Sequence, residues 1–141
     1  MLRRKTAAYA LLAMYEIAQQ HEGDVHPLGV RAHDIAQKHR LPKAYAAKIL
    51  SQLAGAGILH SDRGPRGGFK LNRPVESISL FDVFDGVGAI ISEKNQPASV
   101  RGLPPTVQGV LDRANREAGK ALEDLFSKTT IADVLHQPVG V

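Results

Sequence analysis

At 141 residues, the chain is long enough for one domain with a hydrophobic core and one appended element. It has no cysteine, which excludes disulfides and thiolate metal sites. No apolar run is long enough to span a bilayer or to form a signal peptide, so we expect a cytoplasmic protein with no membrane contact. The net charge of +4 is uneven, because residues 1–73 hold 12 Lys/Arg against 5 Asp/Glu and residues 74–141 hold 6 against 9. A basic first half favours a polyanion as partner.

Hydrophobic periodicity predicts a mainly α-helical chain with one small β-hairpin. We expect helices over residues 6–20, 32–39 and 42–53, with Pro42 in the first turn of the third, then strands over 58–61 and 69–71 around a glycine-rich turn. Ser79 and Asp82 resemble a capping box at the start of a short helix. A six-turn helix is expected over 106–126, and a last short helix after Thr130 precedes a frayed tail at 137–141.

The first three helices have the spacing of a helix-turn-helix, in which the third helix fits the major groove of DNA. We expect Tyr45, Ile49, Leu50 and Leu53 to form the buried stripe of that helix, and Lys43, Ala44, Ala47, Lys48 and Ser51 to form its exposed face. Tyr45 is expected to serve the core and a phosphate contact together. This pattern alone also suits an ordinary small helical domain.

A basic, glycine-rich segment follows the third helix: Arg63-Gly64-Pro65-Arg66-Gly67-Gly68-Phe69-Lys70-Leu71. Arginines here can contact phosphates or enter the minor groove, and glycines let the main chain approach closely. A second basic cluster, Arg3, Arg4 and Lys5, lies at the start of the first helix. The alternative is a plain hairpin turn with solvated arginines. A basic hairpin behind a helix pair favours a winged helix, in which Arg63, Gly64, Arg66, Gly67 and Lys70 contact the DNA backbone.

This combination closely resembles the Rrf2 family of bacterial winged-helix transcriptional regulators, the IscR, NsrR and CymR group. The glycine-rich segment is similar to the family's R-G-P-x-G-G-[YF]-x-L pattern. Supporting matches lie at Tyr9-Ala10-Leu11, Asp34-Ile35-Ala36, Tyr45 with Ile49-Leu50, Ala56-Gly57-Ile58-Leu59, Ile78-Ser79-Leu80 and Thr130–Leu135. The resemblance implies a winged helix-turn-helix over residues 1–74, a short helix and sensor-type loop over 75–105, and a dimerisation helix with a closing helix over 106–136.

The resemblance also implies a homodimer that binds double-stranded DNA at a palindromic operator, most often as a repressor. In the family the long helix crosses its two-fold mate, which here would use Val107, Val110, Leu111, Ala114, Ala118, Ala121, Leu122 and Leu125. The apolar stripe agrees independently, because a six-turn helix needs a partner surface for such a face. The alternative is that the helix folds back on its own domain.

Three features depart from the family. Many members hold an iron–sulfur cluster on three cysteines before the long helix, whereas residues 92–103 contain neither cysteine nor histidine, so we expect no cofactor and no metal. Histidines from two subunits could still meet in a dimer. Arg40 stands in the turn where the family usually has glycine, and Ala47 stands where cluster-type members often place a glutamate, which leaves the operator sequence open.

Two other functions compete with DNA binding. A protein-interaction module, or a regulator controlled by a protein partner, would use the acidic C-terminal half and the loop over 92–105. An enzyme is disfavoured, because the chain has no nucleophile elbow, no Walker-type lysine loop and no paired carboxylates beside a histidine.

Overall fold

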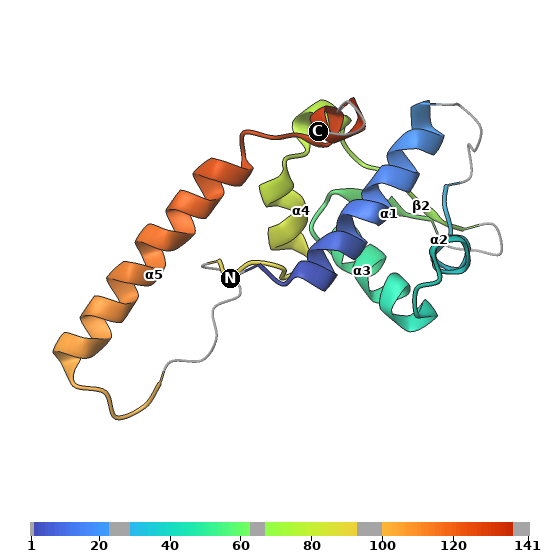
Figure 1. Cartoon of the computed structure of the whole chain (residues 1–141). Helices are drawn as coiled ribbons and strands as arrows, with labels where there is room; N and C mark the ends of the chain where they lie inside the picture. The colour runs from blue at the N-terminus through green and yellow to red at the C-terminus, as the bar shows by residue number, and fades with distance from the viewer. Residues whose placement is uncertain (1, 23–28, 63–66, 93–99, 137–141) are drawn as a thin grey trace.

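The computed structural model describes residues 2–22, 29–62, 67–92 and 100–136, and the described part is helical apart from one small hairpin (Figure 1). Its elements in chain order are α1 (Arg4–Glu22), α2 (Ala32–His39), α3 (Lys43–Gly55), β1 (Leu59–Ser61), β2 (Phe69–Leu71), η1 (Val75–Ser77), α4 (Leu80–Gly86), α5 (Pro105–Phe126) and α6 (Ile131–Leu135). This order confirms the predicted fold class. The predicted tail at 137–141 lies outside the described residues.

The turn between α2 and α3 has the conformation that favours glycine. Arg40 ends α2 with φ 54° and ψ 43°, and its backbone N–H donates to the carbonyl of Ala36. A non-glycine residue in this left-handed region costs roughly 1–2 kcal/mol. Pro42 lies just before α3 at its N-cap and not within its first turn as predicted, because its φ of −59° comes with an extended ψ of 126°.

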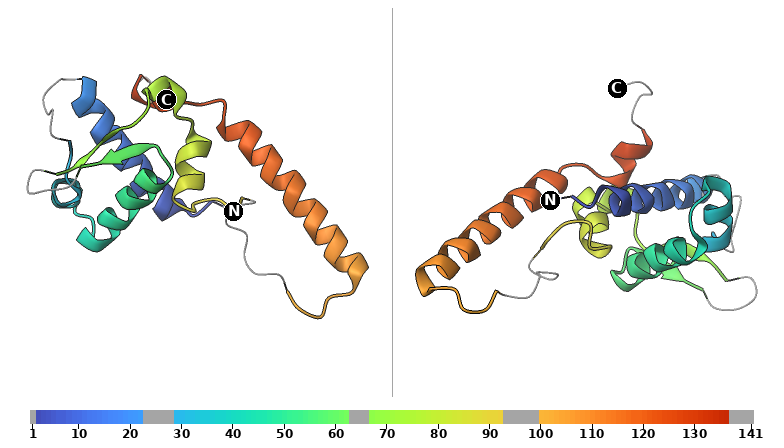
Figure 2. Two further views of the ribbon diagram at one scale, coloured as in Figure 1. Left: turned by 180° about the vertical axis from the view of Figure 1, so that it is seen from behind. Right: turned by 60° about the horizontal axis from the view of Figure 1, so that its bottom comes forward.

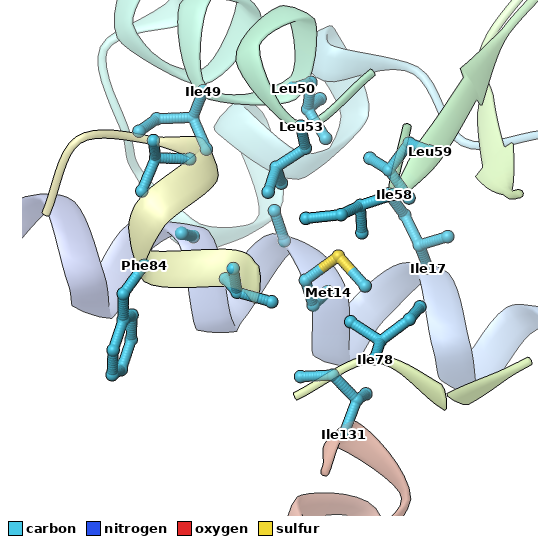
Figure 3. Close-up of a cluster of buried hydrophobic side chains, with 14 of the residues drawn as sticks. Met14, Ile17, Ile49, Leu50, Leu53, Ile58, Leu59, Ile78, Phe84 and Ile131 are labelled. Carbon is cyan, nitrogen blue, oxygen red and sulfur yellow. The ribbon is translucent and has the colours of Figure 1, made fainter. Parts of the chain in front are cut away.

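One hydrophobic core joins the helix-turn-helix to the segments that follow it (Figure 3). Met14 of α1 lies between Leu53 of α3, Ile58 before β1 and Ile78, and each is at most 1% exposed. Burying each such side chain stabilises the fold by roughly 1.5–3 kcal/mol. Ile131 of α6 packs into the same cluster, so the closing helix shares the core of the first 74 residues.

Capping boxes begin the two short helices. Ser79 and Asp82 exchange backbone and side-chain hydrogen bonds of 3.0 Å at the start of α4, which confirms the predicted box. Thr130 and Asp133 do the same for α6. The N–H of Ile131 also donates to the carbonyl of Ile78 at 2.8 Å, which ties α6 back to the body of the protein.

The long helix α5 extends away from the rest of the chain in both orientations (Figure 2). It has no buried residue, and its packing on the body is concentrated at its C-terminal end, where the Phe84 and Phe126 rings pack edge to face with centroids 5.2 Å apart. Helices α1 to α4 therefore pack into one body, while α5 exposes a second surface outside that body.

Candidate nucleic-acid interface

The outer face of α3 is free to enter a groove. Ala46, Ile49, Leu50 and Leu53 are buried and hold the helix to the core. Lys43, Ala44, Lys48 and Ser51 are exposed, and Ala47 is partly exposed. An α-helix fits the major groove of B-form DNA, where lysine and serine can hydrogen-bond with base edges. The expected readout positions therefore share one accessible face.

Tyr45 links α3 to the start of α1. Its hydroxyl lies 2.8 Å from Thr6 Oγ1, and its ring meets Tyr9 edge to face with centroids 5.2 Å apart. The Lys5 ammonium lies 5.9 Å from the centre of the Tyr9 ring. Half-buried Tyr45 thus links the basic N-terminal segment to α3. The sequence predicted its partial burial but not its hydrogen bond to Thr6.

The N-terminal cations are exposed but their backbone is anchored. Arg3, Arg4 and Lys5 all have exposed side chains, and Arg4 and Lys5 lie in the first turn of α1, which begins two residues earlier than predicted. The N–H of Arg3 donates to the carbonyl of Ala89 at 2.7 Å, next to the end of α4. Three cations are therefore held close to the α3 end that carries Tyr45.

The hairpin packs against the helix-turn-helix at Gly68, where the neighbouring backbone leaves little room for a side chain. Strands β1 and β2 pair antiparallel, and Phe69 also forms a bridge with Val30 before α2. A Cβ on Gly68 would lie 3.0 Å from backbone atoms of Gly29 and Val30, which is tighter than nine in ten real Cβ contacts. The bridge extends the hairpin to a third segment, which sequence periodicity did not predict because one isolated pair leaves no pattern.

Charges on the hairpin are partly paired. Asp62 accepts from Lys70 at 3.1 Å and lies 3.1 Å from the His60 ring nitrogen. The hydrogen bond from Lys70 is the main reason that the pKa of Asp62 is lowered. Lys70, expected to hold the backbone of DNA, is thus already in an exposed ion pair. Gly67 is partly exposed, while Arg63, Gly64 and Arg66 lie outside the described residues.

A buried carboxylate fixes the second helix. Glu16 of α1 is 5% exposed, and its oxygen atoms meet Lys38 Nζ at 3.0 Å and His39 Nε2 at 2.9 Å. Burial raises the pKa of Glu16, but the hydrogen bonds and charges of Lys38 and His39 together outweigh this and leave it below the ordinary value of 4.5. The sequence offered no signal for this cluster, since a glutamate on an amphipathic helix normally faces water.

Helix α5 exposes the apolar stripe that the sequence predicted. Val107, Val110, Leu111 and Leu125 are between 43% and 58% exposed. Ala114, Ala118 and Ala121 are also exposed, and Leu122 is partly exposed. Within the described residues this stripe does not fold back on its own domain. The predicted sensor-type loop falls mainly at residues 93–99, outside the described part.

Within the described ranges, no group of three or more His, Asp or Glu side chains is placed to hold a metal ion. Among the same residues, no helix combines the length and the apolar character needed to cross a membrane. The described arrangement offers a basic helix face, a basic N-terminus and a hairpin on one three-helix core. These features define a winged helix-turn-helix, the class of protein that binds double-stranded DNA.

Comparison with known proteins identifies the family. The family model Rrf2, described as an iron-dependent transcriptional regulator, matches residues 3–137. An HTH-type transcriptional regulator of Aquifex aeolicus is 31% identical over 138 residues, covering 96% of this chain and 92% of that protein. A similar regulator of Mycobacterium tuberculosis is 30% identical over 91% of this chain and 77% of that protein. The chain belongs to the Rrf2 family of transcriptional regulators, which are DNA-binding proteins and not enzymes.

Solved structures agree on the fold. CymR of Bacillus subtilis, the global cysteine regulator, superposes with a TM-score of 0.62 over 94% of this chain and 95% of its own, at 24% identity. IscR of T. potens gives a TM-score of 0.59 over 92% and 82%, also at 24% identity. The family description names iron, but a chain without cysteine has no thiolates for an iron–sulfur cluster. The residues present do not fit that cofactor.

Proposed function

We propose that this protein is a homodimeric, sequence-specific DNA-binding regulator that represses transcription without an iron–sulfur cluster. The observation that carries the proposal is the free outer face of α3, joined by the Thr6–Tyr45 hydrogen bond to the N-terminal cations. Lys43, Lys48 and Ser51 would contact bases, with methyl contacts from Ala44 and Ala47. Arg3, Arg4 and Lys5, together with the hairpin, would hold phosphates.

The charge distribution supports a polyanion on this face. No acidic residue occurs between Asp34 and Asp62, a stretch that contains Lys38, Arg40, Lys43 and Lys48. Lys38 is paired with Glu16, which leaves three cations on the turn and on α3. Few side chains on α3 can hydrogen-bond with bases, whereas cations are abundant in this region. Contacts to phosphates should therefore contribute a large part of the affinity.

The exposed stripe of α5 supports a second copy of the chain as partner. An isolated helix of 22 residues is only marginally stable in water, and most helices in proteins are stabilised by packing of an apolar face. A two-fold dimer covers the same stripe on both subunits. Its two α3 helices would then face half-sites about 10 bp apart, or a multiple of this, in a palindromic operator.

Selection of fragmented genomic DNA by the purified protein tests this function. We expect recovery of a roughly palindromic motif close to promoters, and increased expression of the adjacent genes when the regulator is deleted. Uniform recovery of all fragments would contradict sequence-specific regulation. A salt-insensitive complex with a cellular protein in the absence of DNA affinity would instead favour a protein-interaction module.

A further inference from the structure

Arg40 adopts a left-handed backbone conformation, which is unfavourable for a residue that has a Cβ atom. Its φ of 54° makes it the one non-glycine residue with positive φ among those the structure describes. The turn needs this conformation, because the N–H groups of Arg40 and Leu41 both donate to the carbonyl of Ala36. Glycine would satisfy the same turn without steric strain. The side chain of Arg40 therefore does not help to form the turn.

Among the described residues, the side chain of Arg40 also has no partner. It is exposed, and within the described ranges its guanidinium makes no hydrogen bond or ion pair. The neighbouring side chains differ, since Lys38 and His39 both contact the carboxylate of Glu16. Strained residues retained without a structural reason cluster at functional sites.

The position of Arg40 points to the ligand. It lies three residues before Lys43, which begins the helix proposed to enter the major groove. In a helix-turn-helix, the N-terminal residues of the second helix contact base edges in the major groove and the first helix crosses the DNA backbone, so the turn that joins them lies close to phosphates. A guanidinium is planar and presents a fork of donors that matches phosphate oxygens.

We propose that Arg40 is a DNA phosphate contact that anchors the N-terminal end of α3. This inference rests on the proposed DNA-binding function and adds a residue to it. A phosphate contact positions the protein without reading sequence, so Arg40 contributes to affinity on all sequences alike.

The test uses the full-length protein and the DNA fragment that it selects, titrated over a salt series. For Arg40→Gly we expect affinity near 0.1 M salt to fall about eightfold for each phosphate that the protein no longer neutralises, and the slope of log K against log salt to become shallower by about 0.9 per phosphate. Arg40→Gln keeps the strain but removes the charge, and should weaken binding to the same extent.

Two controls keep the outcome decisive. Arg40→Gly should resist urea at least as well as the wild type, which excludes a folding defect. Lys128→Gln removes an exposed charge just beyond the C-terminal end of α5, outside the helix-turn-helix and the hairpin, and should leave the slope unchanged. Unchanged affinity and slope in Arg40→Gly, or an equal weakening in Lys128→Gln, would overturn the role of Arg40 while DNA binding stands. A wild type that binds no DNA would overturn both.

Discussion

At the scale of single residues, a buried carboxylate and a strained backbone conformation shape the turn before the recognition helix. Buried Glu16 fixes the end of α2 through Lys38 and His39, and the strained Arg40 follows immediately. The turn before α3 therefore depends on the buried Glu16 cluster and on the left-handed backbone conformation of Arg40, which costs free energy in any residue other than glycine. Lys38, His39 and Arg40 all lie within five residues of Lys43, which begins the helix proposed to contact DNA.

The Glu16 cluster predicts a dependence of stability on acid. The folded-state pKa of Glu16 is below 4.5, so its contribution is complete above pH 4.5 and is lost as the pH falls through the folded value. Glu16→Gln should lower the free energy of unfolding at pH 7 by about 1–3 kcal/mol, because a buried charged hydrogen-bond acceptor is removed. It should also flatten the decline below pH 4.5.

Urea unfolding at pH 7 and between pH 3 and 4.5 measures both effects. Glu76→Gln makes the same chemical change at an exposed position and should stay within about 0.5 kcal/mol of the wild type. Equal stability of Glu16→Gln and the wild type at pH 7 would show that the cluster does not stabilise the fold.

At the scale of elements, the hairpin is placed by close backbone approach. Gly68→Ala should destabilise the protein by about 1–3 kcal/mol, because the added methyl group displaces Gly29 and Val30 and breaks the Val30–Phe69 bridge. DNA affinity should fall with it. Gly55→Ala adds a methyl group in open space near the end of α3, and should be neutral or stabilising by up to about 1 kcal/mol. Thermal unfolding of the two variants gives the comparison, and equal midpoints would refute the packing argument.

The apolar stripe of α5 carries the prediction for assembly. Leu111→Glu introduces a charge into the stripe and should convert a dimer into a monomer in light scattering after size exclusion. Arg116 lies five residues further on, about 140° around the helix, so Arg116→Glu should leave the dimer intact. A wild type that is already monomeric at micromolar concentration would contradict the proposed dimer.

Much of the element order could be predicted from sequence because its signals are local. The bounds of α2 match the prediction residue for residue, and the capping boxes at Ser79 and Thr130 follow from spacing alone. The Val30–Phe69 bridge and the Glu16 cluster could not be predicted, since both join segments more than 20 residues apart. The short η1 turn was missed because three residues carry no period.

At the scale of the whole molecule, the N-terminal cations, the cations of α3 and its preceding turn, and the arginines expected at the hairpin tip should act together on one DNA duplex. Changing Arg63 and Arg66 to alanine should lower affinity for every sequence and flatten the salt dependence by about 0.9 for each phosphate that is no longer neutralised. Changing Arg113 and Lys120 on α5 to alanine removes the same charge elsewhere and should leave the slope unaltered. An unchanged slope in the double variant at residues 63 and 66 would remove the hairpin tip from the interface.

The central claim is that a basic winged helix binds DNA as a two-fold dimer. The most direct measurement is the binding constant of the purified wild type for its selected fragment over a salt series, with the stoichiometry determined at saturation. We predict two protomers per fragment and a steep linear fall of log K with log salt. Salt-independent binding, or a single protomer per fragment, would contradict the account.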